Sequence, residues 1–259
     1  GTFVAVYKHL NWGEVVGGKS WARVMYRVYS GGAWGAASFI MGAGQQLHVN
    51  LGSMVVGPDD RVHAVLVTEE ADDNKPSVTK VWAVTVEANN TIGSPTLVTN
   101  TPDTTVNPTD QEMFEPWFIG RGQASSTVIA FSMRVLDSAV PKLAALIGTP
   151  DGSSWSLEMV STNVPPVWDT SYEHWMMPVL VNGSVVYAIW SGPEYPNNWY
   201  LYGRKRSVAG VWGAETILID GHTAPVLNSP RYLQDVSPQL VDDGTMTVSG
   251  WASKVAGPW

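Results

Sequence analysis

The chain has 259 residues, 44% of them hydrophobic and 15% charged, which is typical of a packed globular protein and not of a disordered one. The net charge is −8 and no basic run occurs, which argues against nucleic acid or an anionic membrane surface as the main partner. No apolar stretch is long enough to insert into a bilayer as a helix, and the absence of cysteine excludes disulfides and cysteine-ligated zinc.

In chain order, the first 40 residues predict strands without a clear opening hairpin. An apolar run over 1–16 is followed by two apolar runs around Gly31-Gly32 in 22–40. Short hairpins then recur along the chain. In one of them, Asn182-Gly183 supplies the positive φ angles that a two-residue hairpin turn needs. These hairpins cover 52–67, 115–132, 177–190 and 237–251.

The spacing of the hairpins indicates an internal repeat. Aligned on Val56, Ile119, Val181 and Val241, successive copies lie 63, 62 and 60 residues apart. Each of the first three copies is followed by a second hairpin, at 80–98, 142–160 and 199–219. The last strand of such a hairpin opens on a tryptophan three times, at Trp34, Trp155 and Trp212. Units of about this length with four strands, named A to D below, are typical of a β-propeller.

We therefore predict one all-β domain over residues 1–259, a β-propeller of five blades with four antiparallel strands each. The full units are 41–100, 101–162 and 163–219, and 220–259 supplies only an A–B hairpin. Pro141 favours a strand over a short helix in 137–148. Because a closed ring has no free edge strands, we expect strands from the two termini to pair in one blade. Four blades with an N-terminal extra, or a fragment of a longer ring, are the alternatives.

Loop length differs between the two sides of the predicted propeller. The A–B and C–D turns are short, and in an up-and-down blade they emerge together on what we name the short-turn side. The D–A and B–C loops are longer and emerge on the opposite, long-loop side. Long loops on a rigid scaffold are where binding and chemistry concentrate, so we expect the functional site there. The long loops are 41–50, 99–114, 161–175 and 220–236, with 68–79 and 191–198.

The repeat unit, with Pro-x-Leu-Val before a glycine turn and a tryptophan beyond it, resembles the sialidase-type BNR repeat over most of the chain. The segment "TPDGSSW" (149–155) is similar to a shortened Asp-box turn. The segment 47–67 resembles the opening blade of BNR-type polysaccharide lyases, where the matching residues here are His48, Asn50 and His63. The resemblance implies a propeller fold and a polysaccharide as substrate or ligand.

Four residues just before the A strands are candidates for catalysis. Three carboxylates from three blades around one axis suit glycoside hydrolysis as general acid, general base and pKa modulator. His48 with His63 suits a lyase base and its partner, because histidine titrates near neutral pH. The commoner role of such acids is to cap a turn or pair with a neighbour such as Arg231. The catalytic candidates are Glu115, Glu173, Asp235 and His48.

Aromatic residues gather in or beside the long loops. Tryptophan more often packs in a core, but exposed rings beside amide and acid groups are what sugar rings stack on and hydrogen-bond to. Asp169, Asn197 and Asn198 would supply those polar contacts. The predicted ligand-binding residues are Trp117, Trp168, Tyr172, His174, Trp175, Tyr195, Trp199, Arg231 and Tyr232.

We expect no cofactor, because the oxygen ligands that Glu69, Glu70, Asp72 and Asp73 offer Ca²⁺ are more simply a solvated acidic loop. The function predicted is a non-catalytic carbohydrate-recognition or structural module of an extracellular surface or a virion appendage such as a tail fibre. Its partner would be a glycan, with neighbouring domains or subunits of a larger assembly. The alternative is a glycoside hydrolase or polysaccharide lyase acting at the channel mouth. Binding is favoured because neither family's catalytic signature is complete, and the abrupt chain ends fit a processed or excised module.

Overall fold

The computed structural model of this chain is an all-β protein. It describes residues 3–16, 19–41, 47–70, 78–87, 89, 91–101, 119–120, 122–137, 140–161, 179–194, 198–220, 231–240 and 246–254. Every regular element within these ranges is a β-strand, and every strand pairs antiparallel with its neighbour. A search of the same residues finds no helix fit to cross a membrane.

The strands form five sheets that follow one another in the chain. Sheet 1 contains β1 (Phe3–Val16), β2 (Lys19–Ser30), β3 (Ala33–Trp34) and β4 (Ser38–Met41). Sheet 2 contains β5 (Leu47–Val56), β6 (Val62–Glu70), β7 (Val78–Val86) and β8 (Thr96–Thr101). Sheet 3 contains β9 (Gln123–Ala124), β10 (Ile129–Asp137), β11 (Val140–Gly148) and β12 (Trp155–Met159). Sheet 4 contains β13 (Leu180–Asn182), β14 (Val185–Glu194), β15 (Asn198–Arg206) and β16 (Thr216–Asp220). Sheet 5 contains β17 (Arg231–Leu240) and β18 (Met246–Lys254).

Sheets 2, 3 and 4 confirm the predicted units of four antiparallel strands. In each of them the strands pair in chain order, so that they occupy positions A, B, C and D. The turn between β13 and β14 forms one residue later than predicted: Asn182 pairs with Val185 at the end of β13, and Gly183, at φ 56°, and Ser184 make the turn. Trp155 opens β12, and the segment with Pro141 is the strand β11. The spacing of short hairpins was thus sufficient to locate these sheets.

Sheet 1 differs from a complete unit. Its β3 and β4 both pair with β2 and lie in line along it, so the sheet has three strand positions. The same arrangement ends sheets 2 and 4, where a single bridge precedes the D strand. Because β2 corresponds to a C strand, β1 corresponds to a B strand, and no described strand occupies the A position beside it.

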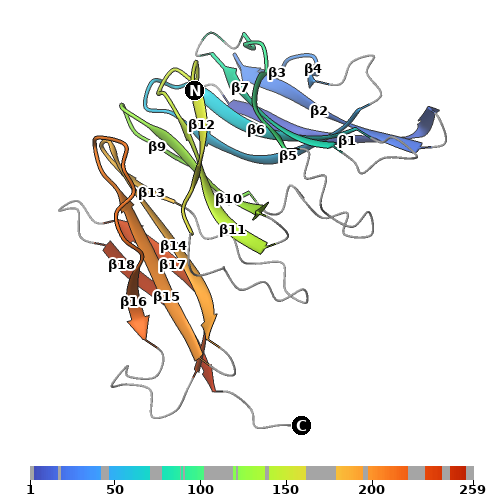
Figure 1. Ribbon diagram of the computed structural model, residues 1–259. Helices are drawn as coiled ribbons and strands as arrows, with labels where there is room; N and C mark the ends of the chain where they lie inside the picture. The colour runs from blue at the N-terminus through green and yellow to red at the C-terminus, as the bar shows by residue number, and fades with distance from the viewer. Residues whose placement is uncertain are drawn as a thin grey trace.

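The predicted pairing of strands from the two termini is not formed by the described residues. The strand β1 pairs with β2, and β17 pairs with β18. Each of these pairs is a hairpin between strands that are consecutive in the chain, and no described strand pairs with the other edge of β1. Sheets 1 and 5 lie at opposite ends of a curved row of sheets (Figure 1).

Neighbouring sheets in the row pack face to face through apolar side chains. Sheet 1 packs on sheet 2 through Val6, Val24 and Leu66. Sheet 2 packs on sheet 3, and sheet 3 on sheet 4, through two further clusters of fully or nearly fully buried residues. A sheet covered on both faces loses the alternation of polar and apolar residues, which explains the continuous apolar runs of the sequence. The A strands β5, β9, β13 and β17 contact one another in that order.

A polar clamp also joins sheets 3 and 4. Arg206 on β15 donates to both carboxylate oxygens of Glu158 on β12, through Nε and Nη2, each at 2.7 Å. The indole Nε1 of Trp212 donates to the same carboxylate at 2.8 Å. Beside them, Arg204 Nη1 donates to the carbonyl oxygen of Val160 at 2.6 Å. Three side chains of sheet 4 therefore hold the D strand of sheet 3.

The B–C hairpins are longer than the sequence predicted, because their strands continue beyond the four-stranded part of each sheet. Glu69 and Glu70, expected in a loop, lie in β6 opposite Thr79 and Val78. Residues 191–194 and 198 lie in β14 and β15, and 140–143 pair in β11 with the end of β10. The predicted loops 68–79 and 191–198 are therefore wrong at their ends. Cross-strand hydrogen bonding outweighed the loop-forming composition of these segments.

Candidate functional site

Most of the residues predicted for the long-loop side lie outside the described residues, so their positions stay predictions. These are Glu115, Trp117, Trp168, Tyr172, Glu173, His174, Trp175 and Tyr195. Because Glu115 and Glu173 are among them, the prediction that these two carboxylates and Asp235 lie around one axis is untested.

The other predicted site residues lie within strands. For Trp199 this agrees with the predicted hairpin over 199–219, and for the rest it corrects their expected place in loops. His48 is on β5 opposite Glu69, and Trp199 is on β15 opposite Pro193. Arg231 and Tyr232 begin β17, opposite Lys254 and Ser253. Asp235 follows within β17, in the irregular stretch between Gln234 and Ser237. A similar irregularity interrupts β5 between Leu51 and Ser53. The bulges let both A strands continue past the point where a regular strand was expected to start.

Four of these residues share one end of their strands. His48, Trp199, Arg231 and Tyr232 stand within two residues of the first residue of an A or a C strand. In an antiparallel A–B–C–D sheet, the starts of A and C lie at the end from which the D–A and B–C loops leave. The predicted association of these residues with the long-loop side therefore holds within each sheet.

The histidine pair proposed for a lyase is wrong. His63 stands opposite Val55, whereas His48 stands opposite Glu69 near the other end of the same hairpin. At about 3.3 Å per residue, the seven residues between positions 48 and 55 separate the two histidines by roughly 20 Å. That distance is too great for the two side chains to act on one proton.

His63 is instead a packed residue at the short-turn side. Its side chain is fully buried, and its Nδ1 lies 3.0 Å from Oγ1 of Thr85. Its Nε2 has no hydrogen-bond partner among the described residues. Burial lowers the pKa of this imidazole below its ordinary value, and the charge of Arg61 acts in the same direction against the nearby carboxylates. The side chain is therefore neutral at physiological pH, with a role in packing sheet 2 against sheet 3.

The turn that resembles an Asp-box lies against this histidine. Asp151 Oδ1 accepts hydrogen bonds from the hydroxyls of Thr149 at 2.6 Å and Ser153 at 2.8 Å, and from the amide of Ser153 at 3.1 Å. These bonds, that of Thr149 first, lower the pKa of Asp151 to about 2. Trp155 Nε1 closes the turn on the carbonyl of Gly152 at 2.9 Å. These hydrogen bonds of Asp151 and Trp155 are all made to other residues of the same turn. They give the turn a structural role.

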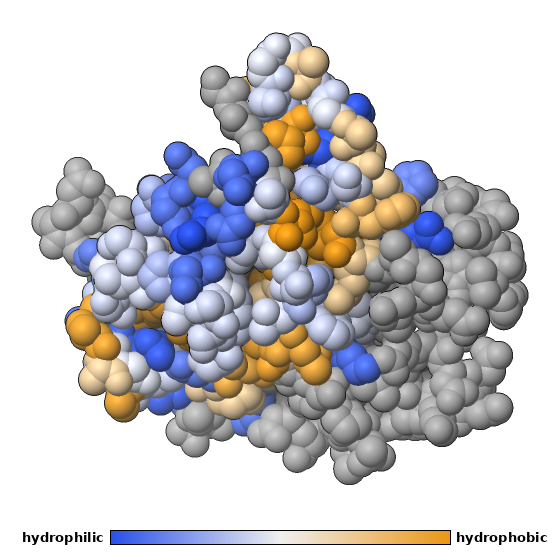
Figure 2. Space-filling model, turned by 90° about the horizontal axis from the view of Figure 1, so that it is seen from above, coloured by the Kyte–Doolittle hydropathy of each residue, from blue (hydrophilic) through white to orange (hydrophobic). Residues whose placement is uncertain are grey.

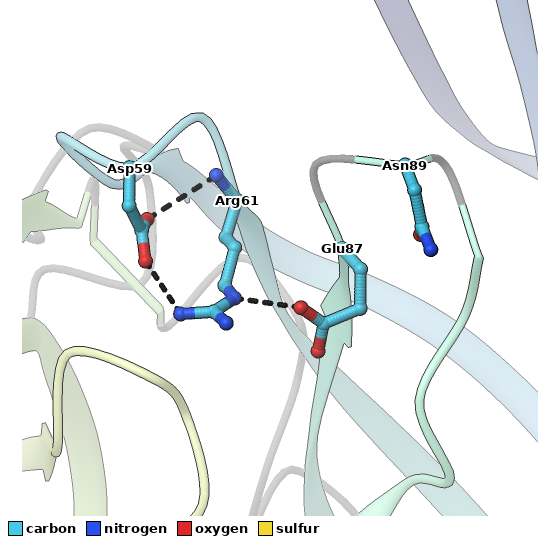
Figure 3. A pocket seen from close by; sticks show the side chains of 4 residues that line it. All are labelled: Asp59, Arg61, Glu87 and Asn89. Carbon is cyan, nitrogen blue, oxygen red and sulfur yellow. Dashed lines mark hydrogen bonds and ion pairs between the residues drawn. The ribbon is translucent and has the colours of Figure 1, made fainter.

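A hollow of about 350 Å³ opens on the short-turn side of sheet 2 (Figure 3). Arg61 lies between two carboxylates: its Nε donates to Glu87 at 2.6 Å and its Nη1 to Asp59 at 2.6 Å. Its hydrogen bond to Glu87 raises the pKa of Arg61, so the cation is permanent. Asn89 completes the lining, and its Oδ1 accepts from the amide and hydroxyl of Thr91.

The hollow could not be predicted from the sequence, because its residues come from the short A–B and C–D turns of sheet 2. Only the close spacing of Asp59 and Arg61 was visible, and Glu87 joins them through the pairing of β6 with β7. The arginine is neutralised by its own neighbours, which leaves no free cation for an anionic ligand. Among the described residues, no group of three or more metal-ligating side chains is found either. The residues that line the hollow are best explained as a set of interactions that hold the two turns of sheet 2 together.

Comparison with known proteins identifies no family. No family model and no curated protein matches the chain. Among solved structures, the chain is similar to the catalytic domain of a GH62 α-L-arabinofuranosidase from Coprinopsis cinerea, with 15% identity over 80% of this chain and 65% of that chain, and a TM-score of 0.27. A score this low carries no argument about activity.

Proposed function

We propose that the five sheets are blades of one β-propeller and that its long-loop side binds carbohydrate. The fold proposal rests on the order of packing: each sheet faces the next, and the A strands contact one another in chain order. Blades arranged around a channel have their first strands innermost, and contacts between successive A strands are what that geometry requires.

The observation that carries the functional proposal is the position of Trp199, Arg231 and Tyr232. All three stand at strand ends on the long-loop side, on rigid paired backbone. An indole and a phenol offer surfaces for a sugar ring, and a guanidinium offers paired donors for hydroxyl or carboxylate groups. Binding without turnover is proposed because the sequence completes the catalytic signature of neither family that it resembles. The module would act on an extracellular or virion surface.

The test is a glycan array combined with turnover measurements on the polysaccharides that bind. Trp199→Ala and Arg231→Gln are expected to weaken binding by about tenfold or more, the effect of one lost stacking or charge-assisted contact. Arg61→Gln, at the short-turn side, is the matched control and should leave binding unchanged. Equal binding by all three variants would refute the proposed site.

The enzymatic alternative keeps Glu115, Glu173 and Asp235 as an acid–base set, with His48 as a lyase base. It is favoured if reducing ends or unsaturated uronates accumulate with wild-type protein and disappear with Glu173→Gln or Asp235→Asn. Neither binding nor turnover would favour a structural role within a larger assembly.

A further inference from the structure

The outward face of sheet 1, the face turned away from sheet 2, corresponds position by position to faces that are buried in the other sheets. The correspondence follows from the C–D hairpins. The amides of Gly35, Gly93 and Gly213 donate to the carbonyls of Val28, Thr85 and Lys205, at 2.8, 2.9 and 2.9 Å. These bonds align β2 with β7 and β15, and the cross-strand register then aligns β1 with β6 and β14.

At these positions the side chains of sheet 1 are more exposed than those of sheets 2, 3 and 4. Phe3 on β1 is 63% exposed, whereas the residues at the same position, Val62, Ile129 and Val186, are 8%, 0% and 0% exposed. Two residues further along the strand, Ala5 is half-buried, whereas Ala64 and Ala188 are each 1% exposed. In sheets 2, 3 and 4 this face packs against the preceding sheet. The described residues include no sheet that precedes sheet 1 in the chain.

Three residues on this face of sheet 1 correspond to the residues of sheet 4 that hold sheet 3. Trp34 corresponds to Trp212, Tyr29 to Arg206 and Arg27 to Arg204, the three residues of the clamp on sheet 3. Arg27 Nε donates to the carbonyl of Gly35 at 2.9 Å, as Arg204 Nε does to Gly213 at 2.7 Å. In sheet 4 this bond leaves Nη1 directed at the preceding sheet, where it holds the carbonyl of Val160.

The rest of the face is aromatic. The rings of Phe3, Tyr29 and Trp34 form a ladder with centroid separations of 5.9 and 5.4 Å, and Trp34 is 47% exposed. Apolar side chains also reach the surface in the view from above, next to polar ones (Figure 2). The rings are tilted against one another, and aromatic surface of this size is costly to leave in water, so the ladder indicates a contact surface.

We infer that the outward face of sheet 1 is a sheet-packing face, and that its occupant is sheet 5 of the same chain. Three observed interfaces pair the outward face of one sheet with the other face of the sheet before it, and closing the row continues this series. Sheet 5 ends the row, and a neighbour in the same chain has a far higher effective concentration than a second molecule. Closure would then join faces, instead of pairing edge strands. The inference rests on the proposed propeller.

The absence of cysteine allows a direct test in the full-length chain. Ala5→Cys places a reporter on the face in question, Ala64→Cys places one at the equivalent buried position of sheet 2, and Val208→Cys places one on a turn residue that is 72% exposed. If the face is covered, the Ala5→Cys thiol should react with maleimide about as slowly as Ala64→Cys and roughly tenfold or more slower than Val208→Cys. All three should react equally in denaturant. A rate close to that of Val208→Cys would overturn the inference.

The occupant is identified by replacing Phe3 with the photo-crosslinking amino acid p-benzoylphenylalanine, which needs no labelling reagent to reach the face, and mapping the photo-adduct by peptide mass spectrometry. Adducts within 231–254 of the same chain are expected. Adducts between isotopically distinct chains, or a dimeric mass in light scattering, would assign the face to a second copy and overturn the inference. Glycan binding that persists in either case would show that closure alone was wrong and that the long-loop site was not.

Discussion

The carboxylate of Glu158 should be the most costly single charge to remove at the interface of sheets 3 and 4. Four donors converge on its two oxygens, namely Arg206 Nε and Nη2, Trp212 Nε1 and the hydroxyl of Ser156, and the side chains of Arg206 and Glu158 are only 16% and 21% exposed. In Glu158→Gln one oxygen remains, and the new NH₂ group faces a donor. Two charge-assisted hydrogen bonds are then lost, each worth about 1.5 kcal/mol at the lower end of the usual range, so we expect a loss of about 3 kcal/mol.

The pH dependence of this loss gives an independent check. Burial alone would raise the pKa of Glu158, but the hydrogen bonds and charge of Arg206, with the bonds of Trp212 and Ser156, bring it below its ordinary value. A carboxyl whose pKa is lowered by folding stabilises the protein above its unfolded pKa, about 4.3, and ceases to do so as the pH falls through the lowered value. The gap between wild type and Glu158→Gln should therefore narrow as the pH falls below the unfolded pKa of about 4.3.

Thermal unfolding followed by circular dichroism measures both effects. For a chain of this size, about 3 kcal/mol corresponds to a fall in Tm of roughly 6–12 °C at pH 7. Glu87→Gln is the matched control, because the Arg61–Glu87 pair is more exposed, at 34% and 37%, and its loss should hardly move Tm. A variant at Glu158 that is as stable as the control, or a gap that persists unchanged at pH 3, would refute the reasoning.

Two further predictions concern the packing of sheet 2 on sheet 3. Gly152→Ala should destabilise the protein by about 2 kcal/mol or more, because Gly152 has φ 70° and an added Cβ would meet Thr85 Oγ1 and His63 Nδ1. Gly183→Ala is the control, because Gly183 has φ 56° but faces open space, and it should cost only about 1 kcal/mol. Chemical denaturation of the two variants distinguishes a clash from backbone strain, and equal losses would show that no clash occurs. Because burial lowers the pKa of His63, the stability of the wild type should fall as the pH drops below the unfolded pKa of about 6.5. His63→Gln should remove that part of the dependence of stability on pH. An identical dependence in the variant would mean that His63 does not titrate in this range.

The sequence by itself determined the local hairpins and their repetition. The hairpin turn at Gly183, the strand containing Pro141 and Trp155 at the start of β12 follow from residue preferences that act over a few neighbours. The sum of such preferences located the five sheets. The boundaries of the long loops did not follow, because Glu69 and the residues around Asp235 are held in strands by partners on another strand.

Tertiary structure alone decided which residues meet across sheets. Glu158 and Arg206 are 48 residues apart in the chain, and Asp59, Arg61 and Glu87 gather only because β6 pairs with β7. His63 looked like a possible base, yet packing between two sheets buries it at the side opposite to His48. Contacts of this kind depend on the faces that each sheet presents to its neighbours. A one-residue change of register would exchange those faces, so short-range preference cannot specify them.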